Sequence, residues 1–379
     1  MEKLKEYIQQ IRGVSYKPTD SLYKPQEGYV PLLRANNINK GKINFENLIY
    51  VKKDKVKESQ YLKKGDILIC TSSGSKELVG KAGLIMKDTN ATFGAFCKVI
   101  RLKECCNNNY FNYYFQSNYY KSMIQKSSNG VNINNLKAEN IDNLSVNILS
   151  YEVQENIANK LDKVQEIIDL RKKQIEVLDE LIKSKFIEMF ESRKYPTKRI
   201  DEVATLKSGT TFSKEYELEN GELLYCKVSD MNLQGNEKYM RSSKTYVSKK
   251  VGLKSSIPAN SVIFPKRGGA IGTNKKRILL NDTCVDLNTM GVTPMEDINI
   301  QYLYYYFINI DLSTLCDGSA VPQLNNKNIG PLEIAVPPIE LQNKFEEIVK
   351  QIDKQKFMIE KSLKETEDLQ ESLMNKYFN

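Results

Sequence analysis

Two stretches of this 379-residue chain repeat one another: SSNGVNINNLKAENIDNLSVNILSYEVQ, residues 127–154, and LCDGSAVPQLNNKNIGPLEIAVPPIELQ, residues 315–342. A constant offset of 188 aligns Gly130 with Gly318, Leu136 with Leu324, Asn140 with Asn328 and Gln154 with Gln342. The same offset runs without a gap to Phe190 and Phe378. An internal repeat of this length indicates that the chain is built from two copies of one structural plan.

Each copy consists of a variable block of about 150 residues followed by a block of about 40 residues with a different residue pattern. The variable blocks predict mixed α and β structure, an α+β fold class, with strands over 66–70, 96–102 and 261–264. Residues 110–120 and 302–307 predict short aromatic helices. Their tyrosines could stack on bases, but core packing is favoured because 302–307 contains no basic residue. Before these repeated stretches the match is looser and needs gaps: residues 13–16 resemble 209–212, and the stretch before Gly13 is a short, poor counterpart of 195–203.

The second block of each copy predicts a long helix. Apolar residues recur at alternating steps of four and three, without Gly or Pro, which is typical of a coiled-coil seam with a left-handed supercoil. A helix of about 38 residues is roughly 57 Å long. The expected seam residues are Ile157, Leu161, Val164, Ile168, Ile175, Leu178, Ile182, Phe345, Val349, Ile352, Ile359, Leu363 and Leu373.

Neither helix can bury its apolar stripe alone, so we expect the two to pair antiparallel within the chain. Five seam positions are polar: Arg171, Lys185, Lys356, Thr366 and Gln370. They are either ordinary irregularities or devices that select register and partner.

Charge is distributed unevenly along the chain, whose net charge is +9. Residues 1–150 carry 23 basic and 13 acidic groups, and residues 193–338 carry 19 and 15, whereas both helical blocks are slightly acidic. This pattern predicts two anion-binding modules separated by a neutral-to-acidic spacer, and it fits nucleic acid better than a membrane surface.

Basic residues and glycine-rich turns recur at matching places in the two variable blocks. A lysine-rich turn is more often simply solvated, but the paired placement favours contact with DNA phosphates or base edges. The candidate DNA-binding residues are Lys52, Lys53, Lys55, Ser72, Ser73, Lys76, Lys81, Lys249, Lys250, Lys266, Arg267, Asn274, Lys275, Lys276 and Arg277.

The composition also excludes several functions. With no histidine there is no Ser-His-Asp or Cys-His hydrolase and no His-ligated zinc. The seven cysteines are odd in number and form no CxxC pair, so neither a disulfide framework nor a structural zinc site is expected, and a reducing compartment fits best.

The turn at 74–82 resembles a phosphate-binding loop but has five residues between its glycines and Ala82 in the Ser/Thr position. We find no methyltransferase tetrad and no two-metal nuclease cluster. No signal peptide and no membrane span is expected.

The chain resembles the specificity subunits of type I restriction–modification systems. The resemblance is carried by the doubled segment ending in residues 335–342 and its partner ending in 151–154, by the two helices that follow, and by 207–212 and 302–307. It covers essentially the whole chain, and the doubled order is its most specific feature.

This resemblance implies target recognition domains at 1–150 and 193–338, with spacer helices at 151–192 and 339–379. It implies that each domain reads half of a bipartite double-stranded DNA site while the helices set the spacing. The implied partners are two modification (methyltransferase) subunits and restriction (translocase-endonuclease) subunits. The chain itself would be non-catalytic and cytoplasmic, and S-adenosylmethionine, ATP and magnesium would bind to those partners. The alternatives are an orphan DNA-binding scaffold, a coiled-coil adaptor and an enzyme that acts alone.

Overall fold

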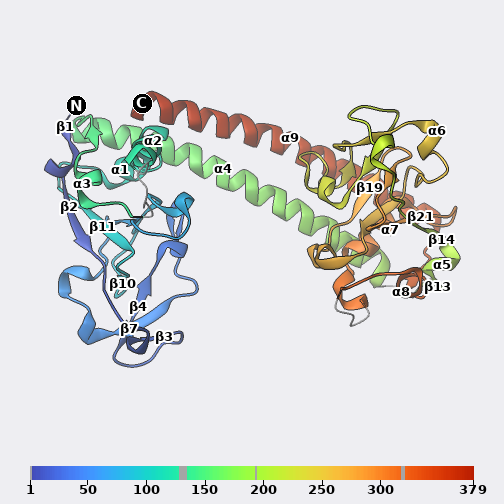
Figure 1. Ribbon diagram of the computed structural model, residues 1–379, viewed down its shortest axis with the longest axis horizontal. Helices are drawn as coiled ribbons and strands as arrows, with labels where there is room; N and C mark the ends of the chain where they lie inside the picture. The colour runs from blue at the N-terminus through green and yellow to red at the C-terminus, as the bar shows by residue number, and fades with distance from the viewer. Residues whose placement is uncertain (1, 128–134, 193, 317–320) are drawn as a thin grey trace. The chain divides into compact units, whose positions relative to one another are not determined.

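The computed structural model describes residues 2–127, 135–192, 194–316 and 321–379, and the chain forms two compact units (Figure 1). Unit 1 consists of residues 1–172 and 361–379, and unit 2 of residues 173–360. Each unit therefore contains one variable block together with a part of both long helices. This grouping crosses the boundaries expected from the sequence, because a helix belongs with whichever block it packs against.

Unit 1 is built on a six-stranded main sheet with a smaller four-stranded sheet beside it. Val99 lies between Ile11 of one neighbouring strand and Leu68 of the other, and all three side chains are buried. In sheet order, the main sheet is β2 (Ile8–Arg12), β11 (Cys97–Leu102), β8 (Ile67–Cys70), β9 (Ala82–Leu84), β6 (Gly41–Ile43) and β5 (Ile38–Asn39). The small sheet is β10 (Thr92–Phe93), β4 (Tyr29–Leu33), β7 (Ile49–Lys52) and β3 (Ser21–Leu22), and β1 (Glu2–Lys3) pairs separately with β12 (Ser145–Val146).

Unit 2 repeats this plan. Its main sheet is β14 (Ala204–Ser208), β21 (Thr289–Pro294), β18 (Val262–Pro265), β19 (Arg277–Leu279) and β16 (Tyr239–Met240). Its small sheet is β17 (Tyr246–Val247), β15 (Leu223–Cys226) and β20 (Cys284–Val285), and β13 (Thr197–Arg199) pairs with β22 (Glu333–Ala335). The predicted strands at 66–70, 96–102 and 261–264 are confirmed as β8, β11 and β18.

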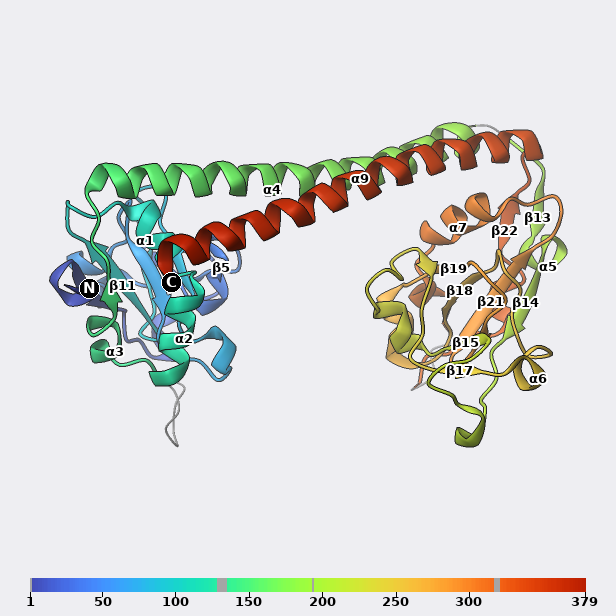
Figure 2. The same cartoon turned by 90° about the horizontal axis from the view of Figure 1, so that it is seen from above.

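Aromatic helices join each sheet to the long helices (Figure 2). In unit 1 these are α1 (Asn108–Tyr114) and α2 (Asn118–Ser127), and in unit 2 the counterpart is α7 (Ile300–Ile308). The sequence predicts one helix over 110–120, but the structure has two, because the Ser117 hydroxyl accepts a hydrogen bond from the Tyr120 backbone N–H at 3.1 Å and starts a new helix. Tyr110, Tyr120 and Tyr302 are buried, which confirms the core-packing interpretation. The shorter helices are α3 (Ala138–Asp142), α5 (Ile200–Val203), α6 (Lys249–Gly252) and α8 (Asn326–Ile329).

The N-terminal edge differs from the sequence interpretation. The Leu4 N–H donates to the Leu144 carbonyl at 2.9 Å, and the Ile200 N–H donates to the Leu332 carbonyl at 2.9 Å. Both contacts follow a short antiparallel pair, β1 with β12 and β13 with β22. The stretch before Gly13 is thus a full structural counterpart of 195–203. The sequence hides it because two-residue strands leave little pattern.

The two long helices, α4 (Tyr151–Phe186) and α9 (Ile339–Phe378), pack together in both units. In unit 1 the start of α4, with Ile157 and Leu161, shares a core with Phe378 at the end of α9. In unit 2 the Phe186 ring near the end of α4 lies 5.6 Å from the Phe345 ring near the start of α9. The helices are therefore antiparallel. The predicted fold class, two mixed domains each followed by a long helix, is confirmed.

The expected seam positions are all at least half-buried. Buried are Ile157, Leu161, Val164, Ile168, Ile182, Phe345, Val349 and Ile352, and half-buried are Ile175, Leu178, Ile359, Leu363 and Leu373.

The five polar seam positions have three kinds of surroundings. The Lys356 ammonium reaches Asp179 on the other helix at 2.6 Å, and Gln370 donates to Gln165 across the pair at 2.9 Å. Lys185 instead donates to Glu188, just beyond the end of α4, and the Thr366 hydroxyl donates to the Ser362 carbonyl within α9. The Arg171 Nε is buried without a hydrogen-bond partner in the described part of the chain.

Candidate nucleic-acid interface

One edge of the main sheet in unit 1 gathers several of the candidate residues. Strand β8 ends at Cys70 opposite Cys97, where β11 begins, and Ile69 lies opposite Ala82, where β9 begins. The residues just beyond these strand ends therefore lie side by side: the turn Thr71–Ser73, Lys81 and Phe96. We call this side of the sheet the strand-end edge of unit 1.

Unit 2 has the corresponding strand-end edge. Strand β18 ends at Pro265 opposite Thr289, where β21 begins, and Ser208 at the end of β14 lies opposite Met290. The residues beyond these ends are Lys266, Arg267 and Asn288. The two edges are thus formed by the same strands in the same register.

The same backbone hydrogen bonds hold both turns. The Thr71 N–H donates to the Phe96 carbonyl at 2.8 Å, and the Lys266 N–H donates to the Asn288 carbonyl at 2.7 Å. The repeated leucines close the other side: the Leu136 N–H donates to the Thr71 carbonyl at 2.6 Å, and the Leu324 N–H to the Lys266 carbonyl at 2.8 Å. Isolated bridges join Ser72 to Asn135 and Arg267 to Gln323.

Two glycines let the chain cross close beneath these edges. A Cβ on Gly13 would lie 2.2 Å from the Gly94 carbonyl oxygen, and one on Gly209 would lie 2.0 Å from the Asp286 carbonyl oxygen. No side chain fits at such distances, because heavy atoms would overlap. The similarity of 13–16 to 209–212 therefore reflects a shared close approach of two backbone segments.

The electrostatics of the unit 2 edge are positive. The Lys266 ammonium donates to the Ser208 hydroxyl at 2.8 Å, and burial, together with the nearby Arg267 charge, lowers the pKa of Lys266. Arg267 is exposed, and its guanidinium has no hydrogen-bond or ion-pair partner within 194–316 or 321–379. The edge thus presents two cations to an anionic or hydrogen-bonding ligand: Lys266, which is hydrogen-bonded to Ser208, and Arg267, whose guanidinium is available for a new contact.

The candidate residues of unit 1 fall into two places. Ser72 and Ser73 are half-buried in the edge turn, and Lys81 is exposed beside it. Lys76 lies in a short 3₁₀ turn, Lys76–Leu78, but its side chain is outside what the structure describes. Lys52 is half-buried and makes a 3.5 Å ion pair with Asp20, while Lys53 and Lys55 are exposed just after β7.

The basic runs at 52–55 and 249–250 match each other in position but lie away from the edges. Val51 pairs with Val30 near the start of β4, whereas the other end of β4 pairs with β10, which leads to Phe96. In unit 2, Val247 pairs with Leu223 at the start of β15. Lys249 and Lys250 are exposed on α6, which follows at that far end of the small sheet.

The candidates at 274–277 have structural roles that the sequence interpretation did not include. Lys276 is only 1% exposed, and its ammonium donates to the Asn274 side-chain oxygen at 2.6 Å and to the Ile310 carbonyl at 2.8 Å. Burial lowers its pKa to about 8. Arg277 donates to the Lys276 and Met231 carbonyls, and Lys275 donates to Asn232. A direct DNA contact by Lys276 does not fit its burial; this cation ties the turn to the segment after α7.

Sequence reasoning missed Phe96, Asn288, Asn135 and Gln323. Phe96 is 71% exposed, and Asn135 and Gln323 immediately precede the repeated leucines. The available signal was this adjacency to the repeat, but only strand register shows that these residues flank the turns.

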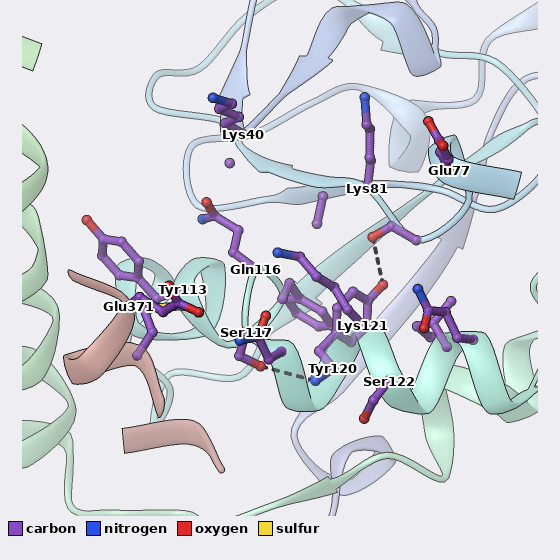
Figure 3. A pocket seen from close by; sticks show the side chains of 18 of the residues that line it. Lys40, Glu77, Lys81, Tyr113, Gln116, Ser117, Tyr120, Lys121, Ser122 and Glu371 are labelled. Carbon is purple, nitrogen blue, oxygen red and sulfur yellow. Dashed lines mark hydrogen bonds between the residues drawn. The ribbon is translucent and has the colours of Figure 1, made fainter. Parts of the chain in front are cut away.

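A cavity of about 1220 Å³ in unit 1 includes Lys81 of the strand-end edge, and its lining carries both lysines and the glutamates Glu77, Glu367 and Glu371 (Figure 3). Its lining includes Lys40, Lys81, Lys121 and Lys126. In Figure 3, Lys40 and Lys81 project from loops on one side and Lys121 from α2 on the other, with Gln116 between them. The Tyr120 hydroxyl donates to the Gly80 carbonyl at 2.9 Å and joins the two sides.

The corresponding place in unit 2 is filled. The Lys238 ammonium lies 5.2 to 5.6 Å from the ring centroids of Tyr239, Tyr304 and Tyr305 and pairs with Asp353 at 2.7 Å. The matching strand of unit 1 has Gly41, which leaves room for the Gln116 amide. The same strand position thus carries a glycine in unit 1 and, in unit 2, a lysine within an aromatic cluster.

Within the described ranges, no group of three or more Cys, Asp or Glu side chains could hold a metal ion. No described helix combines the length and the apolar character that crossing a membrane requires.

Comparison with known proteins gives matches of two kinds. A family model described as the type I restriction modification DNA specificity domain matches the chain twice, over residues 8–180 and 193–367. The chain is 39% identical over 173 residues to the type I restriction enzyme StySPI specificity subunit of Salmonella potsdam and 37% identical over 173 residues to the EcoKI specificity subunit of Escherichia coli (strain K12). Each alignment covers 46% of this chain but 37% of the relative, so the chain spans little more than a third of their length.

The fold has a counterpart among solved structures. The crystal structure of the S subunit of a type I restriction–modification system from M. genitalium superimposes with a TM-score of 0.57 at 16% identity. The superposition covers 100% of this chain and 95% of that one. At this identity the likeness concerns the fold: two similar domains, each followed by a long helix.

Proposed function

We propose, from the premise that the chain belongs to the family of type I restriction modification DNA specificity domains and carries that domain twice, that it is the DNA-specificity subunit of a type I restriction–modification complex. Each recognition domain reads one half of a bipartite double-stranded DNA site. The observation that supports this most directly is the doubled strand-end edge, one backbone arrangement that presents different side chains in the two units.

Charge supports DNA as the ligand. The positive excess of the chain lies in the two recognition blocks, and Lys53, Lys55, Lys81, Lys249 and Lys250 are all exposed. Phosphate contacts supply most of the affinity of such proteins and position them without reading sequence. We assign these lysines to phosphates and the edge turns to base edges in the groove.

The repeated fold, with a long helix after each block, supports the following assignment of roles. Blocks 1–150 and 193–338 serve as recognition domains, and the helical blocks 151–192 and 339–379 set the distance between the half-sites. The same helices dock two modification (methyltransferase) subunits, and restriction subunits complete the complex. S-adenosylmethionine, ATP and magnesium belong to those partners, the chain itself performs no catalysis, and the assembly works in the cytoplasm, where its DNA substrate is.

The test is co-expression with the methyltransferase gene that neighbours its own, followed by size-exclusion chromatography and methylation-aware sequencing of host DNA. A stable complex and a methylated motif in two parts are expected. A monomer with unmodified host DNA would contradict the proposal and favour an orphan scaffold or adaptor.

Salt dependence of binding separates phosphate contacts from base contacts. The variant with Lys249→Ser and Lys250→Ser should bind all DNA sequences more weakly, and its slope of log affinity against log salt should fall by about 0.9 per lost contact. Preserved affinity and slope would show that these lysines do not meet phosphates.

A further inference from the structure

The two units share the backbone that forms the strand-end edges and differ in the side chains displayed there. Three pairs of positions correspond by their hydrogen bonds and bridges: Ser72 with Arg267, Phe96 with Asn288, and Asn135 with Gln323. At each pair the chemistry changes: hydroxyl to guanidinium, aromatic ring to amide, short amide to longer amide.

Two pairs of supporting residues, by contrast, are identical in the two units. Asn140 and Asn328 each accept a hydrogen bond from the backbone N–H three residues earlier, at 2.9 and 2.8 Å. Leu136 and Leu324 are both buried, and both close the edge turn through their backbone N–H groups. The three displayed pairs thus differ in chemistry beside two pairs of residues that are the same in both units, as expected of two domains that read different half-sites.

Arg267 is suited to reading a base. Its backbone is extended, with φ −143° and ψ 138°, and is held by the bridge to Gln323. The direction of the Arg267 Cα–Cβ bond is therefore fixed. The guanidinium is exposed and unpaired in the described part of unit 2. A free, planar five-donor fork matches the two acceptors of guanine in the major groove, O6 and N7.

Unit 1 presents a different surface at the same place. Ser72 is half-buried, and its carbonyl accepts a weak contact from the Cys70 thiol at 3.6 Å. The exposed Phe96 ring lies beside it, and the Phe96 carbonyl accepts from the Thr71 and Ser72 N–H groups and from the Thr71 hydroxyl. An exposed aromatic ring on this hydrogen-bonded backbone favours apolar contact, such as with a thymine methyl group.

We propose that these three pairs of positions determine base specificity, and that Arg267 reads a guanine in the half-site of the second domain. The inference rests on the proposed function. It makes the strand-end edge the element that enters the groove, and it predicts that the two half-sites differ because Ser72 and Arg267 occupy the same structural position.

The experiment compares Arg267→Ser with Arg241→Ser, each co-expressed with the methyltransferase and mapped by methylation-aware sequencing. Arg241 is also exposed in unit 2 but lies at the end of β16, beside the Tyr239 ring. Arg267→Ser should lose discrimination at one guanine position of one half-site by about 5- to 150-fold, with the other half-site unchanged. Arg241→Ser should methylate the wild-type motif.

Arg267→Lys separates base reading from phosphate contact, because lysine keeps the charge and loses the bidentate fork. It should lose the same guanine preference. Full retention of the motif in either Arg267 variant would overturn the inference while leaving the proposed function intact, since the wild type in the same experiment still gives a motif in two parts. A wild type with no such motif would overturn the proposed function itself.

Phe96→Asn tests the first unit, with Met86→Asn as its control, because Met86 is similarly exposed at 69%. Phe96→Asn should change one position in the other half-site only. A change in the half-site already assigned to Arg267 would contradict the pairing of edges with half-sites.

Discussion

At the residue scale, two buried glutamines hold the starts of the long helices to the loops that precede α1 and α7. The Gln154 side chain is fully buried; it accepts from the Asn107 N–H at 2.9 Å and donates to the Cys105 and Leu149 carbonyls. Gln342 makes the same three contacts in unit 2, with the Asn299 N–H and the Asp297 and Pro337 carbonyls. The repeated Gln is thus conserved within the chain because it satisfies three backbone groups at once.

Gln154→Ala should destabilise unit 1, and Gln342→Ala unit 2, each by about 2–4 kcal/mol, since each leaves buried backbone groups unpaired. Urea unfolding followed by circular dichroism measures this. Gln351→Ala, an exposed position on α9, is the control and should change stability by less than about 0.5 kcal/mol. Equal effects of all three substitutions would contradict the role given to the buried pair.

Lys276 predicts a specific pH dependence of stability. Its pKa is about 8 in the folded chain, below the usual value of about 10.4, because burial disfavours the ammonium. The unfolded chain therefore binds more protons between pH 8 and 10.5, and the contribution of this residue to stability rises with pH across that window. Below pH 8 the contribution is constant and unfavourable.

The measurement compares wild type with Lys276→Met from pH 7 to 10. The free energy of unfolding of wild type should rise relative to the variant by up to about 1.4 kcal/mol per pH unit above pH 8. Parallel profiles for the two proteins would show that Lys276 titrates normally.

At the element scale, α9 is fastened to the sheet of unit 2 by a cation within the aromatic cluster. The Lys238 side chain, 17% exposed, pairs with Asp353 on α9. Burial lowers the pKa of Lys238, although the Asp353 carboxylate by itself would raise that pKa. Removing only the carboxylate would leave a mostly buried charge without its counter-ion.

Asp353→Ala should therefore cost about 3 kcal/mol. The control is Asp368→Ala, which removes the partner of Lys364 from an exposed i, i+4 pair on the same helix and should cost about 0.5 kcal/mol or less. Thermal unfolding of the two variants measures these costs. Similar losses of stability in both would mean that the aromatic cluster does not depend on the ion pair.

At the scale of the whole molecule, the proposed function makes the helix pair a ruler. Contacts from Gln165 to Gln370 and from Asp179 to Lys356 place residues 171–177 of α4 opposite about 358–364 of α9. Deleting 171–177 and 358–364 together keeps the heptad register of both helices. It shortens the spacer by about 10 Å, close to three base pairs.

Methylation mapping of this double deletion should show unchanged half-sites with a shorter gap. Deleting 171–177 alone is the control, since it breaks the register between the helices and should lower the yield of complex instead. An unchanged gap in an intact complex of the double deletion would refute the ruler.

The sequence by itself determined the doubled plan and the long antiparallel helices, because these depend on periodicity and repetition, which are visible along the chain. Its uneven charge favoured the nucleic-acid ligand that the proposed function adopts. It also located Arg267 and Ser72 on corresponding turns. Only the tertiary structure decided that Lys276 is buried, that Lys249 lies away from the strand-end edge, and that Phe96 and Gln323 flank the turns. Which side chains share one edge depends on strand register, and register depends on contacts between residues distant in sequence.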